Sequence, residues 1–94
     1  MIIIREIFIA RPGKASTLAK MFKDMKMKGT FRVLTDFVSD FNQVILESEY
    51  KDLGEFEARM KSYTADEEKQ WKEKMKGYHD LYLTGRREVL RVFE

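Results

Sequence analysis

Residues 31–50 read FRVLTDFVSDFNQVILESEY, and this stretch decides the fold because it places two adjacent strands in the middle of the chain. Phe31 to Ser39 alternates between two faces, and Gln43 to Tyr50 is a second run of the same kind. Asp40-Phe41-Asn42 lies between them, and Asp and Asn tolerate the geometry of a tight turn. The stretch therefore predicts a β-hairpin.

A strand and a helix are predicted before this hairpin. Ile2 to Ala10 is rich in β-branched residues, which favours a strand, and Pro12-Gly13 ends it. Apolar residues then recur at i, i+3, i+4, i+7 and i+10, which is the pattern of one helical face: Ala15, Leu18, Ala19, Phe22 and Met25. Gly29 is expected to end this helix.

A helical region and a last strand are predicted after the hairpin. Its apolar positions are spaced as in a helix, first Leu53, Phe56, Met60 and Tyr63, then Trp71, Met75, Tyr78 and Tyr82. Thr64 and Glu67 match a capping box, so the region is expected to break or bend there. Gly77 weakens the second piece by about 1 kcal/mol relative to Ala. Glu88 to Phe93 is predicted as the closing strand.

The order strand, helix, strand, strand, helix, strand is the βαββαβ arrangement of a ferredoxin-like fold. We therefore predict a single α+β domain over residues 1–94, with a four-stranded antiparallel sheet and helices on one face. The uncovered face would carry mixed sets such as Arg32-Leu34-Asp36-Val38 and Gln43-Ile45-Glu47-Glu49. Two sheets packed face to face would bury the apolar members of these sets, and a monomer with a mixed surface is the alternative.

Composition excludes several classes of function. The chain is 36% charged with a net charge of +2, which argues against disorder and against a dedicated nucleic-acid-binding protein. It has no Cys and one His, so no metal site or other cofactor is predicted. The opening Met1-Ile2-Ile3-Ile4 is too short for a signal or membrane segment. We expect a cytoplasmic protein that has no membrane contact.

Charge is distributed unevenly along the chain. Residues 11–32 hold seven basic residues and one acidic residue, whereas residues 36–57 hold seven acidic residues and one basic residue. Two opposed charged regions on one small domain favour self-association or an oriented partner. Two solvated faces would account for the same pattern.

The pattern resembles the dimeric α/β-barrel superfamily, and within it the NIPSNAP-like proteins and the antibiotic-biosynthesis-monooxygenase-like branch. The resemblance is carried by the element order, the Ile-rich first strand, Trp71 in a helical segment, and the final Gly85-Arg86-Arg87-Glu88-Val89-Leu90-Arg91-Val92. It implies a homodimer in which two ferredoxin-like subunits stack their sheets into a barrel. The superfamily includes cofactor-free monooxygenases acting on phenols and haem-degrading enzymes. The haem-degrading branch has Asn on the first strand, which Ile2 to Ala10 lacks.

His79 and Arg86 are the candidate catalytic residues. His79 is the one side chain with an ordinary pKa near neutrality, so it could take a phenolic proton. Arg86 and Arg87 point to opposite faces of an extended segment, and one of them could hold an anion or enolate. A histidine at a helix end and two arginines in surface ion pairs are the alternative interpretations.

The candidate ligand-binding residues are Trp71, Tyr82, Arg87, Arg32 and Tyr63. Trp71, Tyr63 and Tyr82 could form aromatic walls of a pocket or simply belong to the core. Arg32 and Asp36 lie on one face of the predicted second strand and could line the same cavity or pair with each other. The sequence thus predicts a protein that binds a small hydrophobic or phenolic molecule in the barrel, with a cofactor-free monooxygenase-like activity as one form of it. A non-catalytic dimeric module for metabolite binding or interaction is the alternative, and the sequence does not decide between them.

Overall fold

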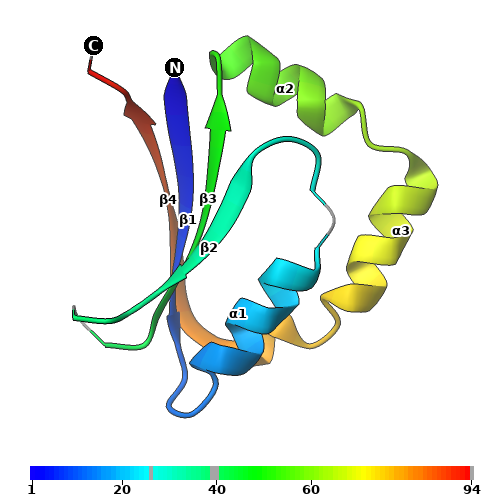
Figure 1. The fold of residues 1–94 in the computed structure, drawn as a ribbon. Coiled ribbons are helices and arrows are strands. Elements are labelled where there is room, and N and C mark those ends of the chain that lie inside the picture. The colour runs from blue at the N-terminus through cyan, green and yellow to red at the C-terminus, as the bar shows by residue number, and fades with distance from the viewer. Residues whose placement is uncertain (26, 39–40, 94) are drawn as a thin grey trace.

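The computed structural model describes residues 1–25, 27–38 and 41–93. The elements follow one another as β1 (Ile2–Ala10), α1 (Ala15–Asp24), β2 (Phe31–Thr35), β3 (Gln43–Tyr50), α2 (Leu53–Lys61), α3 (Ala65–Lys74), the 3-10 turn η1 (Tyr78–Leu81) and β4 (Tyr82–Arg91). Figure 1 shows one sheet with all the helices on one side of it. This is the predicted α+β ferredoxin-like fold.

The sheet has the strand order β2-β3-β1-β4, and every neighbouring pair is antiparallel. The register pairs Ile7 with Ile45 on β3 and with Arg86 on β4. Paired residues point to the same face, so Ile7 shares its face with Ile45 and Arg86. Because side chains alternate along a strand, Arg5 and Ile9 lie on this face as well. Phe8 lies on the other side, where its ring meets Phe22 of α1 at a centroid distance of 5.1 Å. Even-numbered residues of β1 therefore face the helices.

The main core forms where α1 packs on the sheet. Leu18 and Phe22 of α1 are buried against Val44 of β3 and Ala10 of β1. Ala15, Ala19 and Met25 pack around this cluster, so the apolar face predicted from the sequence is the face that the helix buries. The hairpin leading into β3 is described only in part. Asn42 and Phe41 have positive φ values of 60° and 83°, whereas the predicted turn residue Asp40 lies outside the described residues.

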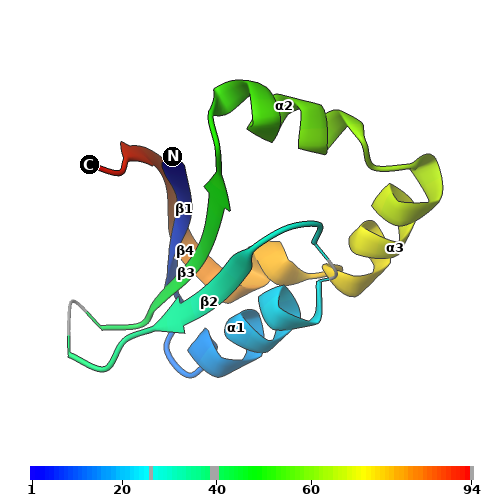
Figure 2. The same cartoon turned by 45° about the horizontal axis from the view of Figure 1, so that its top comes forward.

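The second helical region is divided into two helices, as the capping box predicted. Thr64 accepts a hydrogen bond from the backbone N–H of Glu67, and the Glu67 carboxylate accepts one from the N–H of Thr64. These two bonds satisfy N–H groups that the first turn of α3 would otherwise leave unpaired. α2 and α3 then turn away from one another, and Figure 2 shows them forming an arch over one side of the sheet.

The predicted helix continuing to Tyr82 is wrong, and the last strand, predicted over Glu88–Phe93, has different bounds. α3 ends at Lys74, and Gly77 adopts the left-handed conformation with φ 84°, which glycine reaches without a steric penalty. One 3-10 turn follows, and β4 begins six residues earlier than predicted, at Tyr82. Pairing of β4 with β1 along its length outweighs the helical spacing of the aromatic residues. β2 is also shorter than predicted and ends at Thr35.

None of the helices in the described part of the chain is long and apolar enough to cross a membrane.

Candidate functional site

A cavity of about 540 Å³ lies on the helix-covered side of the sheet, between β1, β3 and β4 and the segment from α3 to η1. Its position differs from the space between two stacked sheets that the sequence predicted. Its described walls are mostly aromatic and apolar, with charged residues among them: Glu6, Phe8, Phe22, Met25, Leu46, Trp71, Lys72, Met75, Lys76, Gly77, Tyr78, His79 and Arg87. Two of the predicted ligand-binding residues, Trp71 and Arg87, and the predicted base His79 are among them.

An ion pair joins the first and last strands at this cavity. Glu6 and Arg87 are directly opposite each other in the sheet, and Arg87 Nε donates to Glu6 Oε1 at 2.6 Å. The guanidinium also lies over the ring of Phe56 in α2, 5.8 Å from its centroid. Both contacts show that Arg87 points to the helix-covered face. Of the two neighbouring arginines, Arg87 is therefore the one that reaches the cavity.

The stretch from Tyr78 to Tyr82 brings three ring side chains together. His79 Nδ1 lies 3.1 Å from Tyr82 Oη, and the Tyr78 and His79 rings are 4.0 Å apart between centroids. Burial raises the pKa of Tyr78 above its usual value, and the neighbouring Tyr82 and Glu6 raise it further. Tyr78 thus stays protonated at neutral pH and can donate a hydrogen bond.

The tautomer of His79 decides what its ring can do. When Nδ1 carries the hydrogen, it donates to Tyr82 Oη, and Nε2 is left with a lone pair that can accept a proton. When Tyr82 donates instead, Nε2 carries the hydrogen and the ring can only act as a donor through it. His79 is exposed and lines the cavity, so a ligand can contact the ring.

Trp71 and Tyr63 stack on each other, but only Trp71 is among the cavity walls. Their centroids are 4.3 Å apart. Tyr63 is buried, and its Oη accepts a hydrogen bond of 2.7 Å from the backbone N–H of Lys28. Tyr63 therefore packs against Trp71 without lining the cavity, and its hydrogen bond connects the α2–α3 junction to the segment before β2. Tyr82, which is likewise not among the cavity walls, packs edge-on against Phe8, with 4.9 Å between centroids.

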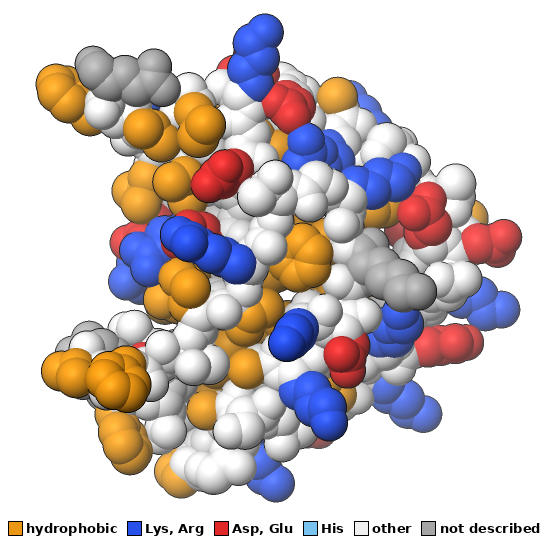
Figure 3. Space-filling view, viewed as in Figure 1, with side chains coloured by type: hydrophobic (Ala, Val, Ile, Leu, Met, Phe, Trp, Pro, Cys, Tyr) orange, Lys and Arg blue, Asp and Glu red, His pale blue; other side chains and the backbone are white. Residues whose placement is uncertain are grey.

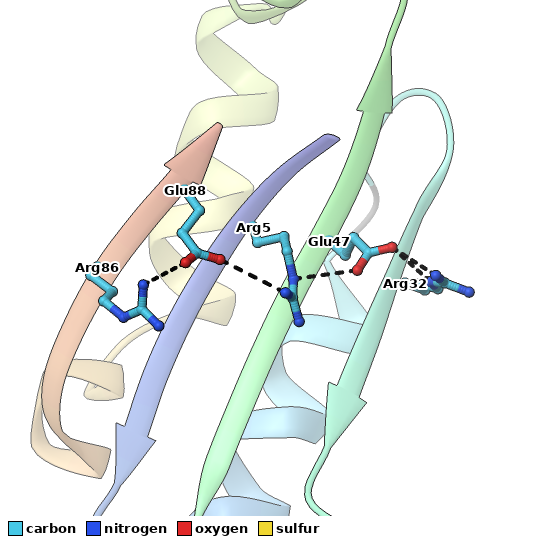
Figure 4. A network of polar contacts seen from close by, with 5 residues as sticks. All are labelled: Arg5, Arg32, Glu47, Arg86 and Glu88. Carbon is cyan, nitrogen blue, oxygen red and sulfur yellow. Dashed lines mark hydrogen bonds and ion pairs between the residues drawn. The ribbon is translucent and has the colours of Figure 1, made fainter. Parts of the chain in front are cut away.

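Arg86 and Arg32 lie on the opposite, uncovered face of the sheet, so the structure does not bring them together with His79. Figure 4 shows them at the two ends of a charged row that crosses all four strands. Arg32 Nη2 lies 2.7 Å from Glu47 Oε1, and Arg86 Nη1 lies 2.7 Å from Glu88 Oε2. Arg5 joins the two carboxylates, at 3.5 Å from Glu47 and 3.7 Å from Glu88. The surface ion pair expected as the alternative for Arg86 is what the structure shows. Arg32 is also in an ion pair, but its partner is Glu47 on the neighbouring strand and not the predicted Asp36.

Three charged cavity residues were not recognised in the sequence: Glu6, Lys72 and Lys76. Glu6 had a detectable signal. It lies between Ile4 and Phe8 on one face of an Ile-rich strand, and a carboxylate on such a face needs a partner. The lysines had no comparable signal, since an exposed Lys on a polar helix is common. Within the described residues, no three His, Asp or Glu side chains gather as a metal-ion site would require.

Solved structures share this fold. The chain superposes on an uncharacterised NIPSNAP domain protein from Burkholderia xenovorans with a TM-score of 0.80 at 17% identity, covering 99% of this chain and 95% of that one. A NIPSNAP family protein from Agrobacterium tumefaciens superposes with a TM-score of 0.78 at 16% identity, covering 99% of this chain and 93% of that one. A candidate antibiotic biosynthesis monooxygenase from Nitrosomonas europaea superposes with a TM-score of 0.65 at 14% identity, and the alignment covers 100% of both chains.

The predicted resemblance is confirmed at the level of the fold, which is what likeness at such low identity establishes. The sequence matches no protein-family model and no curated protein. Activity and ligand therefore have to be argued from the site itself.

Proposed function

We propose that the protein binds a small aromatic or phenolic molecule in the cavity between the sheet and α3. The observation that carries this proposal is a cavity of about 540 Å³ walled by Phe8, Phe22 and Trp71, with the polar groups of Tyr78 and His79 among them. Volume in this range and mainly apolar walls with a few polar groups are typical of small-molecule sites. Aromatic walls favour a ring-shaped ligand, because rings stack or pack edge-on against one another.

The test is a titration with N-phenyl-1-naphthylamine, a neutral aromatic probe whose fluorescence rises in apolar surroundings. Met75→Trp would fill the cavity, because Met75 is one of its walls. We expect this variant to lower the affinity at least about tenfold, as loss of apolar contact area predicts. Met60→Trp is the matched control, since Met60 lies on α2 and is not a cavity wall. Equal affinities for both variants and the unaltered protein would contradict the proposal.

A second candidate, cofactor-free oxygenation of the bound phenol, is favoured by the contact between His79 and Tyr82. A ring held through Nδ1 at 3.1 Å could take the phenolic proton on Nε2 and leave an electron-rich phenolate for reaction with dioxygen. Oxygen uptake with a panel of phenols and hydroquinones tests this candidate. Uptake that His79→Ala abolishes would support it, and uptake that the variant leaves unchanged would exclude His79 as the base.

We also propose that two copies pair through the uncovered sheet face. Each charged group of the row has an oppositely charged neighbour there, and the five residues together carry a net charge of +1, so covering the row leaves no charge without a partner. Ile7 and Ile45 lie beside the row on the same face. Figure 3 shows two groups of hydrophobic side chains at the left of the view, on the side away from the helices. One group lies over the β2–β3 hairpin and the other over the end of β4. An exposed apolar area of this kind often marks an interaction surface.

A further inference from the structure

We propose that the ligand of the cavity is an aromatic anion, such as an aromatic carboxylate, and that Lys72 and Lys76 hold its charged group. This inference rests on the proposed function, because it names the class of molecule that the cavity takes. It departs from the simpler expectation of a neutral hydrophobic ligand. The supporting observation is the charge on the cavity walls.

The charge of the cavity is one-sided. Arg87, Lys72 and Lys76 contribute positive charge, and Glu6 is the one carboxylate among its described walls. Glu6 already pairs with Arg87 at 2.6 Å. The positive charge that remains belongs to the two lysines. A ligand with a negative group would neutralise part of it, whereas a neutral ligand would leave it unchanged.

Neither lysine has an ion-pair partner among residues 1–25, 27–38 and 41–93. Lys74, which lies between them in the sequence, instead directs its Nζ to the Asp24 carbonyl oxygen at 3.5 Å. Other lysines near the α2–α3 junction are paired, Lys28 with Glu67 at 3.7 Å and Lys61 with Glu57 at 3.1 Å. The ammonium groups at the cavity thus keep their donors available for a ligand.

The apolar part of the ligand has a separate place. Phe8 of β1 and Phe22 of α1, whose rings contact each other, line one side of the cavity, whereas both lysines come from the end of α3 and the residues just after it. An aromatic anion would therefore place its ring toward these phenylalanines and its charged group toward the lysines. A molecule with a ring at one end and an anionic group at the other can contact the aromatic side chains and the lysines at the same time.

Basic residues near a helix C-terminus also have a purely structural use, because they offset the negative end of the helix dipole. Lys72 and Lys74 lie in the last turn of α3 and could have that use alone. The two accounts differ in what they predict. Offsetting a dipole changes the stability of α3, but it gives no preference for a charged ligand over a neutral ligand of the same shape.

Two fluorescent probes separate these accounts. 1-Anilinonaphthalene-8-sulfonate carries a sulfonate, and N-phenyl-1-naphthylamine has the same ring system without it. We expect the sulfonate probe to bind at least about tenfold more tightly at low salt, and its advantage to shrink as salt screens the lysines. The double variant Lys72→Gln/Lys76→Gln should lower the affinity for the sulfonate probe about tenfold, since each partly exposed charge contributes a few-fold. Affinity for the neutral probe should stay within about twofold.

The matched control is Lys20→Gln/Lys69→Gln, which removes the same charge from α1 and α3 at positions outside the cavity walls. Equal affinities of the unaltered protein for the two probes would overturn the inference. So would an equal loss of sulfonate binding in the control variant, because the effect would then come from net charge alone. Either result would leave the binding of a neutral aromatic ligand intact, whereas failure of both probes to bind would contradict the proposed function itself.

Discussion

Arg87 Nε donates a 2.6 Å hydrogen bond to Glu6 Oε1, and this contact joins residues 81 positions apart at the floor of the cavity. It connects the first strand to the last on the face that the helices cover. Because the Arg87 side chain is 56% exposed, water screens the pair. We expect Glu6→Gln to lower the free energy of unfolding by no more than about 1 kcal/mol, the usual value for an exposed pair.

The same variant removes the one carboxylate among the described cavity walls, so binding of 1-anilinonaphthalene-8-sulfonate should become tighter. Urea unfolding and probe titration measure the two effects separately. A stability loss well above this value would show that the pair is more deeply desolvated than its exposure suggests.

The capping box at the start of α3 should contribute measurably to stability. Thr64→Ala removes the side-chain acceptor of the Glu67 N–H, and we expect a loss of about 1 kcal/mol in the free energy of unfolding, the typical value for an N-cap. Thr17→Ala is the matched control. It removes the same hydroxyl from an exposed position on α1, where Ala favours the helix, so stability should stay equal or rise.

Glu67 makes this cap dependent on pH. Its hydrogen bond with the backbone N–H of Thr64 lowers the pKa of the carboxyl below its ordinary value of 4.5, and the Thr64 hydroxyl and Lys28 lower it further. A group whose pKa is lower in the folded state stabilises the fold above its unfolded pKa, and this contribution is lost as pH falls through the folded pKa. Below pH 4.5, stability should therefore fall more steeply for the unaltered protein than for Glu67→Gln. Parallel pH profiles would disagree with this expectation.

Gly85 should resist substitution because of the Phe8 ring. A Cβ atom at this position would lie 3.0 Å from Phe8 Cε1, closer than packing normally allows. We expect Gly85→Ala to lower the free energy of unfolding by about 1 kcal/mol, the lower end of what overpacking costs. If the ring could move freely, the variant would instead gain stability, because Ala reduces the entropy of the unfolded chain. Chemical denaturation distinguishes a loss from a gain.

Pairing through the uncovered sheet face predicts different effects for two neighbouring residues of β4. Leu90 pairs with Ile3 on the uncovered face, and Val89 pairs with Ile4 on the helix-covered face. Their exposed fractions are similar, 43% and 49%. Leu90→Asp should weaken dimerisation at least about tenfold, because it places an unpaired charge in the interface, whereas Val89→Asp should not. Sedimentation equilibrium measures both. A monomer for the unaltered protein at every concentration would refute the pairing.

Much of the fold could be predicted because it depends on local patterns. The hairpin from Phe31 to Tyr50, the apolar face of α1 and the break at Thr64 each follow from spacing or capping within a few residues. The opposite directions of Arg86 and Arg87 follow from the two-residue period of a strand. The period does not tell which of the two arginines points to the helices, because that depends on how β4 aligns with β1.

The sequence by itself determined the element order, the boundary that Thr64 marks, and the residue types available to a site. The first helix, expected to end at Gly29, ends at Asp24. Only the tertiary structure decided that β4 begins at Tyr82, because sheet pairing with β1 outweighs the helical spacing of the aromatic residues. It also decided that His79, Trp71 and Arg87 share a cavity while Arg86 faces away. The physical reason is that a cavity is assembled from segments distant in sequence. The spacing of residues within one helix or strand gives no information on how far that element lies from another.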